Sequence, residues 1–366
     1  MKKGLFSLLL VAVMVSVSSA QVFIGARQAG MGGTGVASAV GLNAVAYNPA
    51  GLMQGPNSEF LLSVGTASQG LDKIISTASG DPTKAMQDNF NSTFSANGSI
   101  SGLLGLSVNK VGVSLLVPSI YAMIDKPTAG TYTGSSATAL GYYALVLTLG
   151  RTFSVPGLPI GSLDAGVNLK AVTGAYGDFT PAAATATSNY AQGSGVGADA
   201  GVRASLNIPA ISSFSVGLAL RNIAQSITYN PGLRTYTVNP LTGELTLASD
   251  VPQGSRSDTM PTSTVIGCAG NISPIGLGFA ADIESISGGS GYFQASSTTV
   301  THLGLEYSLL MNALILRAGL ATSDKINMTT LGAKINIPFL TLEIANVIDN
   351  KNSSNTSYVI DAGVAF

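Results

Sequence analysis

The residues that could do chemistry are few, and the single histidine comes first. His302 is the only histidine in the 366-residue chain, and in a strand it would share a face with Glu306. A Ser-His-Asp triad on a nucleophile elbow would need a Gly-x-Ser-x-Gly segment, which the sequence lacks. One histidine and one cysteine, Cys268, also fall short of the usual zinc ligand sets. We therefore expect no enzyme, no metal site and no cofactor.

A glycine pattern near the N-terminus suggests a nucleotide site but lacks its context. Gly30, Gly32 and Gly35 match Gly-x-Gly-x-x-Gly. In dinucleotide-binding proteins this motif follows a strand and precedes an acidic residue about twenty positions later, and neither is found here. Together with Gly33, these glycines could instead let the backbone pack closely against a wall or flex when a ligand passes.

The charged residues suggest either ion pairs or a head-group site. Many of them fall on one face of the strands predicted below, and isolated charges in a narrow interior would be costly to desolvate, so pairing is one interpretation. The other is that an arginine binds a carboxylate through its planar fork, with Arg27, Arg221 and Arg317 as candidates. The residues on this face are Lys170, Asp199, Arg203, Arg221, Asp282, Glu284, Glu306, Arg317, Lys334, Glu343 and Asp361.

The composition indicates a surface that does not face water. Charged residues make up 10% of the chain, whereas a soluble domain carries about a quarter, and the chain contains 44 glycines. Mean hydropathy is positive, at +0.39. The net charge of −1 provides no basic field, so we expect no nucleic-acid partner. We interpret Cys268 as a small apolar strand residue.

The first twenty residues resemble a secretory signal peptide. Lys2 and Lys3 supply the positive region, an apolar stretch follows, and Ser18-Ser19-Ala20 fits a cleavage site. Beyond Ala20 no apolar run reaches the roughly 18 residues that a spanning helix requires. If the chain crosses a bilayer, it must do so with strands.

Period-two alternation supports such strands. Between Gly195 and Asn207, alternate residues from Val196 to Leu206 are apolar, and the residues between them are mostly small or polar. The same pattern predicts fourteen strands, at 59–65, 93–108, 111–121, 138–153, 162–176, 194–207, 214–227, 259–271, 275–286, 299–308, 313–321, 328–337, 339–347 and 358–366.

The connections alternate between short and long, as in a transmembrane barrel. Residues 109–110 and 309–312 are short turns, whereas 66–92, 122–137, 177–193, 228–258 and 287–298 are predicted to be long solvated loops. A soluble sandwich would also alternate, but its exposed face would carry more Lys and Glu. The long loops contain few large apolar residues, so an external apolar groove is not expected.

The segment before the first strand has no strand period. It contains Arg27-x-x-Gly30-Met31-Gly32-Gly33 and ends in Tyr47-Asn48-Pro49-Ala50-Gly51-Leu52. We predict a signal peptide at 1–20, a compact, partly helical hatch at 21–57 and a barrel at 58–366. The chain ends in alternating residues up to Phe366, a pattern similar to the signal that barrel-assembly machinery reads.

These N-terminal motifs resemble the start of FadL-type outer-membrane proteins, and more closely the PorV/TraF-like branch. The resemblance implies a 14-stranded antiparallel barrel with the hatch in its lumen, in the outer membrane of a diderm bacterium. It also implies passive transport of hydrophobic molecules such as long-chain fatty acids, gated by the hatch. Asn48, Pro49 and Ala50 are then either a gating element or a turn that starts the first strand.

A second function remains open. PorV-like relatives suggest a non-transporting barrel that docks or shuttles proteins for secretion or surface attachment. In either case the expected partners are outer-membrane lipid and the assembly machinery, with hydrophobic small molecules added if the protein is a transporter. Bound lipid in the purified protein would favour transport, and a co-purifying secreted cargo would favour docking.

Overall fold

The computed structural model describes residues 23–69, 86–87, 90–154, 160–182, 184–208, 211–337, 340–351 and 356–366. The predicted signal peptide lies outside these ranges, as does most of the predicted loop 66–92. None of the described helices is long and apolar enough to cross a bilayer.

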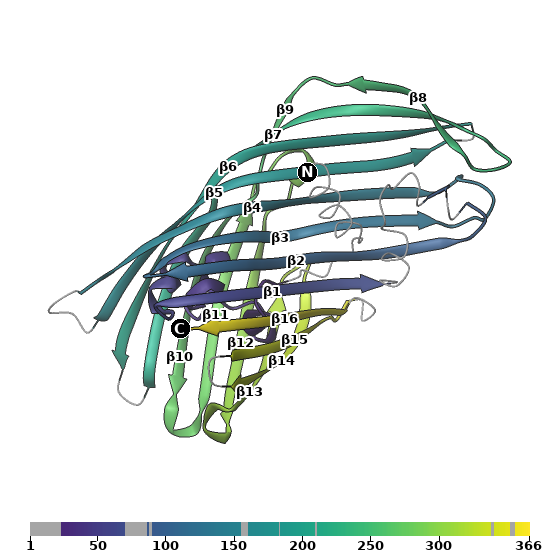
Figure 1. Ribbon diagram of the computed structural model, residues 1–366. Coiled ribbons are helices and arrows are strands. Elements are labelled where there is room, and N and C mark those ends of the chain that lie inside the picture. Colours follow the sequence, from purple (N-terminus) through teal and green to yellow (C-terminus); the bar gives the residue numbers. More distant parts are fainter. Residues whose placement is uncertain are drawn as a thin grey trace.

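The described strands form one closed antiparallel sheet (Figure 1). β1 pairs with β16, and β7 pairs with β10, which closes the sheet into a barrel. β8 and β9 also pair with β7, beyond β10, so β8, β9 and β10 together act as one interrupted strand. The circuit therefore has fourteen strands, and this prediction is confirmed. The strands are β1 (Ser58–Gln69), β2 (Phe94–Val108), β3 (Val111–Lys126), β4 (Ser136–Phe153), β5 (Ile160–Pro181), β6 (Thr185–Ile208), β7 (Ile211–Val238), β8 (Leu245–Pro252), β9 (Arg256–Thr259), β10 (Thr262–Ile272), β11 (Leu277–Ser287), β12 (Thr298–Leu309), β13 (Leu314–Thr322), β14 (Asn327–Ile337), β15 (Leu340–Asp349) and β16 (Thr356–Ala365).

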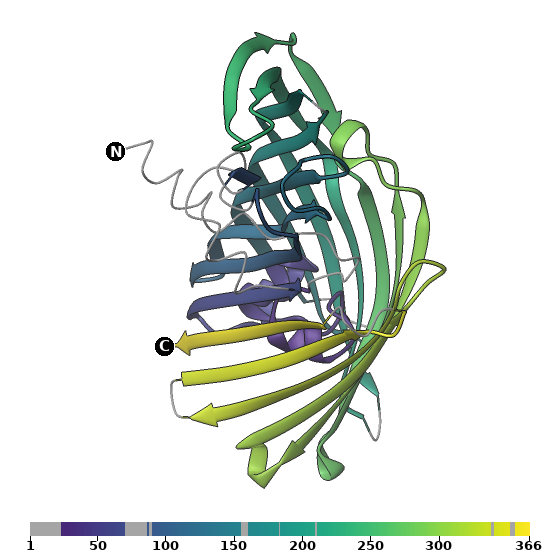
Figure 2. The same cartoon turned by 90° about the vertical axis from the view of Figure 1, so that its right-hand side faces the viewer.

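The strands differ greatly in length, which makes one side of the barrel taller than the other (Figure 2). β6 has 24 residues and β7 has 28, whereas a membrane crossing takes about 9 to 11. The predicted loops 177–193 and 228–258 are therefore wrong, because most of their residues continue β5, β6 and β7 or form β8 and β9. Likewise, β3 and β4 take up the two ends of the predicted loop 122–137. Small polar residues suit a solvated strand as well as a loop, and pairing with the neighbouring strand decides between them.

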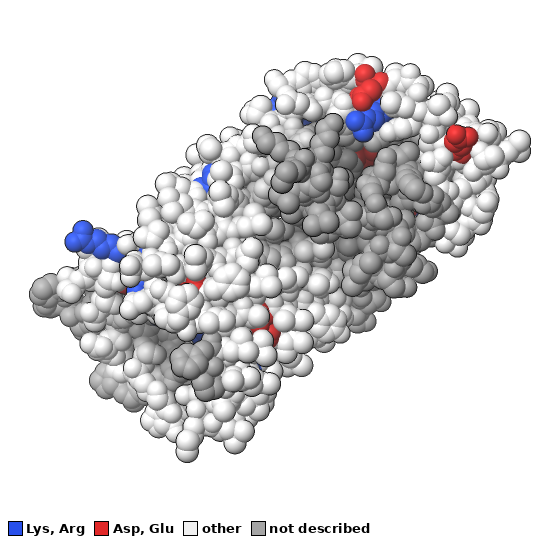
Figure 3. Space-filling model, viewed as in Figure 1, with Lys and Arg blue, Asp and Glu red and all other residues white. Residues whose placement is uncertain are grey.

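The barrel wall has an apolar outer belt. Phe60, Leu62 and Val64 on β1 point outward and are each 42% exposed, and comparable residues follow on the other strands. Cys268 pairs with the outward-facing Val216, which places it on this face. The side in Figure 3 shows only scattered charged residues on the atoms that are not grey. An apolar belt over a polar interior is the pattern of a barrel in lipid.

The hatch folds inside the barrel, close to the end with the short turns. It contains α2 (Ala26–Gly30), η1 (Gly41–Ala46) and η2 (Pro49–Gln54). α2 packs against β13 to β16, η1 against β1 to β3, and η2 against β4 to β6. Most hatch residues from Phe23 to Met53 are buried. The predicted position of the hatch in the lumen is confirmed.

We call the barrel end with residues 109–110 the short-turn end and the other the long-loop end. At the short-turn end, Asn109 and Lys110 have φ values of 49° and 65°, as a two-residue hairpin turn requires. Turns of this kind connect neighbouring strands without a long loop.

Candidate functional site

A cavity of about 350 Å³ lies on the long-loop side of the hatch. We call it the upper chamber. The hatch supplies Phe23, Ile24 and Val45, and the barrel wall supplies Leu116 and Tyr142, among others. A cavity of this size, lined mainly by aliphatic and aromatic side chains, is typical of sites for small hydrophobic ligands.

A short aromatic segment borders the chamber. η4 (Gly291–Phe293) lies in the connection between β11 and β12, and its Phe293 lines the chamber. Phe293 packs edge-to-face on Tyr142, with ring centroids 5.5 Å apart. Tyr292 stacks on Tyr176 of β5, with ring centroids 4.0 Å apart. The segment thus reaches into the lumen as far as β4 and β5, and we call it the aromatic lid.

Hydrogen bonds tie the aromatic lid to β9. The backbone N–H of Tyr292 donates to Oδ2 of Asp258 at 2.9 Å, and the N–H of Ser290 donates to the carbonyl of Thr259 at 2.9 Å. Arg256 donates to both oxygens of Asp258 and lies over the Tyr292 ring, 4.2 Å from its centroid. Burial alone would raise the pKa of Asp258, but Arg256 and the Tyr292 N–H hold it below its usual value on balance.

The charged groups of the upper chamber neutralise one another. Lys170 donates to Asp199 at 2.6 Å, and Arg221 pairs with Glu284. His302 lies 3.5 Å from Glu284 through Nε2, while its Nδ1 is 2.7 Å from the carbonyl oxygen of Gly32 in the hatch. Of the two interpretations of the inward charges, ion pairing is the one the described residues show here.

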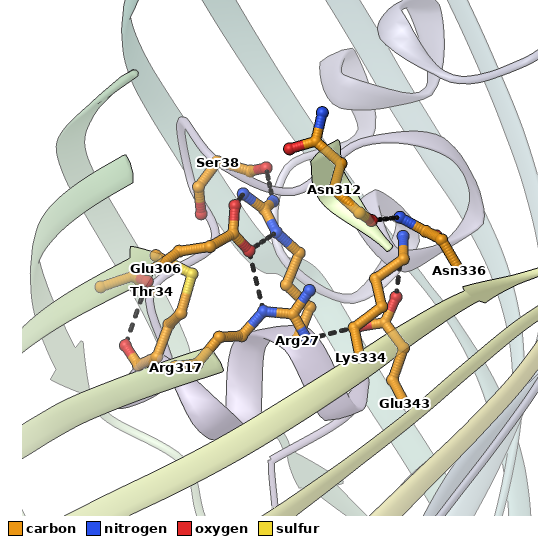
Figure 4. A network of polar contacts seen from close by, with 10 residues as sticks. Arg27, Thr34, Ser38, Glu306, Asn312, Arg317, Lys334, Asn336 and Glu343 are labelled. Atoms are coloured by element: carbon orange, nitrogen blue, oxygen red, sulfur yellow. Dashed lines mark hydrogen bonds and ion pairs between the residues drawn. The ribbon is translucent and has the colours of Figure 1, made fainter. Parts of the chain in front are cut away.

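A second cavity, of about 390 Å³, lies on the short-turn side of the hatch. We call it the lower cavity. Arg27 of α2 donates to Glu306, and Arg317 bridges Glu306 and Glu343 at 2.8 and 2.6 Å (Figure 4). Lys334 adds a contact to Glu343 at 3.3 Å. Two of the three candidate arginines, Arg27 and Arg317, thus share one network, whereas Arg221 lies apart in the upper chamber.

Wall carboxylates also hold the hatch backbone. Asp282 accepts hydrogen bonds from the N–H groups of Gly35 and Val36 at 2.6 and 3.0 Å. Glu59 accepts from the N–H of Leu42 at 2.7 Å, and Asp361 accepts from that of Ala26 at 2.8 Å. These bonds satisfy buried backbone groups that irregular structure would otherwise leave unpaired.

The segment Asn48-Pro49-Ala50 joins the hatch to β5 and β6. Asn48 caps η2 through a bond from the Ala50 N–H, and its Nδ2 donates to the carbonyls of Val36 and Val202 at 2.7 and 3.0 Å. Wall glycines permit this contact: a Cβ on Gly166 would lie 2.4 Å from the carbonyl carbon of Pro49. The segment is therefore both a helix start and a tight contact with the wall.

Comparison with known proteins identifies the architecture. No protein-family profile and no curated protein sequence matches the chain. Solved structures do. The Ralstonia pickettii toluene transporter TbuX matches with a TM-score of 0.59 and 15% identity, over 96% of this chain and 100% of that one. The Pseudomonas putida toluene transporter TodX matches with a TM-score of 0.59 and 13% identity, over 95% and 99%. A Pseudomonas aeruginosa FadL homologue matches with a TM-score of 0.59 and 14% identity, over 95% and 98%.

The chain has the fold of the FadL-type transporters. Because sequence identity to these structures is only 13 to 15%, the similarity shows a shared fold and nothing more. None of the neighbours bears on the PorV/TraF-like branch, which stays a prediction.

Within this FadL-type fold, the hatch glycines lie at close contacts with the wall or with other hatch residues. A Cβ on Gly32, which has φ of 70°, would lie 2.4 Å from the carbonyl of Leu320. One on Gly35 would lie 2.3 Å from the Tyr47 ring, and one on Gly30 would lie 3.0 Å from Cα of Gly332. Gly33 packs against Phe23 and His302. The described geometry shows close packing for all four.

Several site residues could not be found from the sequence. The aromatic lid falls within the predicted loop 287–298, and Asp258 falls within the predicted loop 228–258. Glu59 and the fully buried Asp164 were absent from the set of inward charges. The pair Tyr292-Phe293 in a polar connection was the one available signal, because large aromatic side chains are rarely left in solvent.

Proposed function

We propose that this protein is a passive outer-membrane channel for uncharged hydrophobic molecules. The observation that carries the proposal is the upper chamber, lined mainly by apolar side chains, inside a barrel with an apolar outer belt. An apolar solute gains little from a water-filled pore, so its passage calls for a chamber of this kind. The FadL-type fold supports the proposal.

The chamber favours small uncharged ligands over fatty acids. Among the described residues, every charged side chain lining it already has an opposite partner, so no arginine is left over for a carboxylate. The aromatic rings of Tyr142 and Phe293 suit flat apolar molecules. TbuX and TodX are described as toluene transporters, and CymD as a monoaromatic hydrocarbon channel. Toluene is therefore the first ligand to test, and a long-chain fatty acid the second.

The hatch is proposed as the gate on the short-turn side, because it separates the two cavities. Deleting residues 21–41 should leave a barrel that folds but conducts small solutes, and liposome swelling measures this. Unchanged permeability would show that the segment is no plug.

A groove in the outer wall offers a second exit. It has a volume of about 650 Å³, is lined almost entirely by apolar atoms, and shares Lys170 with the upper chamber. The strand register shifts here between β6 and β7, where Asn222 and Ala224 have φ values of 59° and 50°. A bulge of this kind locally disrupts the ladder of backbone hydrogen bonds.

The transport test combines uptake with two matched variants. Radiolabelled toluene and oleate are offered to cells that express the protein or lack it; uptake of neither would overturn the proposal. Ala171→Phe fills the groove, and Ala165→Phe places the same side chain on the outer face of the same strand outside it. Slower uptake with the first variant alone would assign the exit to the wall, whereas equal uptake would assign it to the hatch.

One observation favours the docking function as a second candidate. β8 is exposed along nearly its whole length, and among the described residues it pairs with β7 alone. A free strand edge outside the apolar belt could receive an extended segment of a secreted protein. Cross-linking from Leu247 to a secreted cargo would support docking, and normal surface display of cargo in a deletion strain would exclude it.

A further inference from the structure

Four polar side chains converge on the first turn of the hatch, around Gly25 and Ala26. The Gly25 N–H donates to Oγ of Ser63 on β1 at 3.1 Å, and the Ala26 N–H donates to Oδ2 of Asp361 on β16 at 2.8 Å. The side-chain oxygens of Gln28 and Asn43 each lie 2.6 Å from the position that a Cβ on Gly25 would take. These groups come from both the hatch and the wall.

Three oxygens in this cluster have no hydrogen bond of ordinary geometry among the described residues, although Ser63 and Asn43 approach the Asp361 carboxylate as weaker donors. The three oxygens are Oε1 of Gln28, Oδ1 of Asn43 and Oδ1 of Asp361. Gln28 and Asp361 are each 1% exposed, and all three residues line the lower cavity. A buried acceptor without a donor costs free energy, so three of them at one place require an explanation.

The surroundings of Asp361 also lack a positive charge. No cationic side chain among the described residues lies within 4.0 Å of its carboxylate. Its register partner on β15 is Glu343, a second carboxylate, whose own cations are Arg317 and Lys334. A buried carboxylate beside another one is costly, and either a cation or a proton would relieve the cost.

We propose that Gln28, Asn43, Asp361 and Ser63 form a binding site for a monovalent alkali cation, Na⁺ in the first instance, which pins the hatch to the wall. The site goes beyond the proposed transport function and would exist whether or not the protein carries hydrocarbons.

The donor set indicates this class of ion. Carboxylate, amide and hydroxyl oxygens are hard ligands that suit hard cations, whereas the soft metals prefer sulfur or imidazole. Calcium sites generally combine several carboxylates, but here Asp361 supplies the single one. One negative charge with neutral oxygens matches a singly charged ion, and the lower cavity leaves room for water to complete its coordination.

The test measures unfolding of the purified full-length barrel in detergent. Chloride salts of Na⁺, K⁺ and choline are compared at equal ionic strength, which separates a specific ion from general screening. The unfolding midpoint should rise by several degrees in NaCl and saturate with its concentration, because an ion that binds only the folded state stabilises it. Asp361→Asn should abolish the dependence on Na⁺.

Asp282→Asn is the matched control. Asp282 is also buried on the wall and accepts two bonds from the hatch backbone, but it lies away from Gln28 and Asn43. This variant should keep the full response to Na⁺. Crystals of the wild-type protein soaked in Tl⁺ should show an anomalous peak among the three oxygens, a readout that does not depend on any variant folding.

Three outcomes would overturn the proposal. Equal midpoints in all three salts would mean that no ion binds. An Asp361→Asn protein that keeps the full response to Na⁺ would mean that the carboxylate is not a ligand of the ion. An empty Tl⁺ map, with the Asn43 or Gln28 amide turned to donate to Asp361, would mean that the cluster satisfies itself.

Discussion

The phenol rings of Tyr176 and Tyr292 lie stacked, 4.0 Å between centroids and 17° from parallel, although 116 residues separate them. Tyr176 belongs to β5, and Tyr292 belongs to the connection between β11 and β12. The contact therefore spans the lumen rather than joining neighbouring strands. Together with the hydrogen bonds to β9, it holds the aromatic lid beside the upper chamber.

Under the proposed transport function a ligand enters past the aromatic lid, so locking the lid in place should block entry. Oγ1 of Thr259 and Oγ of Ser290 are 3.2 Å apart, close enough for a disulfide between cysteines at these positions. The variant Thr259→Cys/Ser290→Cys should take up toluene slowly when oxidised and normally after reduction.

A second cross-link controls for general stiffening of this end of the barrel. Thr298 and Asp324 lie on the same rim, with 2.7 Å between Oγ1 and Oδ1, but outside the lid. Thr298→Cys/Asp324→Cys should leave uptake unchanged in both redox states. Equal slowing by the two cross-links would argue against a lid.

The hydrogen bond between the Tyr292 N–H and Asp258 should weaken at low pH and not at high pH. The pKa of Asp258 is lower in the folded protein than in a free side chain, so its contribution is complete above the ordinary value of about 3.9 and is lost as pH falls through the folded value. Entry of an apolar fluorescent probe such as N-phenyl-1-naphthylamine should be constant from about pH 5 to 8 and faster below about pH 4. The Asp258→Asn variant should admit the probe quickly at every pH. Slow, pH-sensitive entry in this variant would show that the Asp258 carboxylate does not hold the lid.

The two faces of β6 should respond differently to a new charge. Val202 points outward and is 41% exposed, whereas Ser205 pairs with the buried Ser215 on the inner face. Val202→Arg should lower the free energy of unfolding by about 2 to 4 kcal/mol, and Ser205→Arg by much less. Urea unfolding in lipid vesicles measures both, and equal losses would reverse the face assignment.

The network beneath the hatch should be sensitive to loss of its central arginine. The side chain of Arg317 is 1% exposed and bridges two carboxylates, so Arg317→Met leaves buried negative charge without its partner. We expect a loss of about 3 kcal/mol in the free energy of unfolding. Arg151→Met, at an exposed arginine near the short-turn end, should change little. A small effect at both positions would show that Arg27 and Lys334 compensate.

The barrel could be predicted because its signal is local. Alternation from Val196 to Leu206 assigns one face to lipid and the other to the lumen without any knowledge of the neighbouring strands. The ends of β5, β6 and β7 could not be predicted, because Thr, Ser, Asn and Gly on both faces give no period. There the pairing with adjacent strands decides, and a single sequence does not reveal it.

The site was predictable only in part, for a related reason. Arg27, Arg221 and Arg317 could be chosen as inward arginines, but which carboxylate each one meets depends on register and on the path of the hatch. The stack of Tyr176 on Tyr292 and the bond from Tyr292 to Asp258 join segments far apart in sequence. The role of Phe366 with assembly machinery stays a prediction; the structure places its side chain 72% exposed at the end of the chain.

The place where the cylinder closes has a consequence for biogenesis. β1 and β16 meet last in chain order, and the first turn of the hatch touches both, through Ser63 and Asp361. The hatch therefore cannot complete its attachment until β1 has paired with β16. An insertion intermediate in which these two strands are still unpaired would hold its N-terminal segment through only one of them. Closure of the barrel and attachment of the hatch are then completed in the same step.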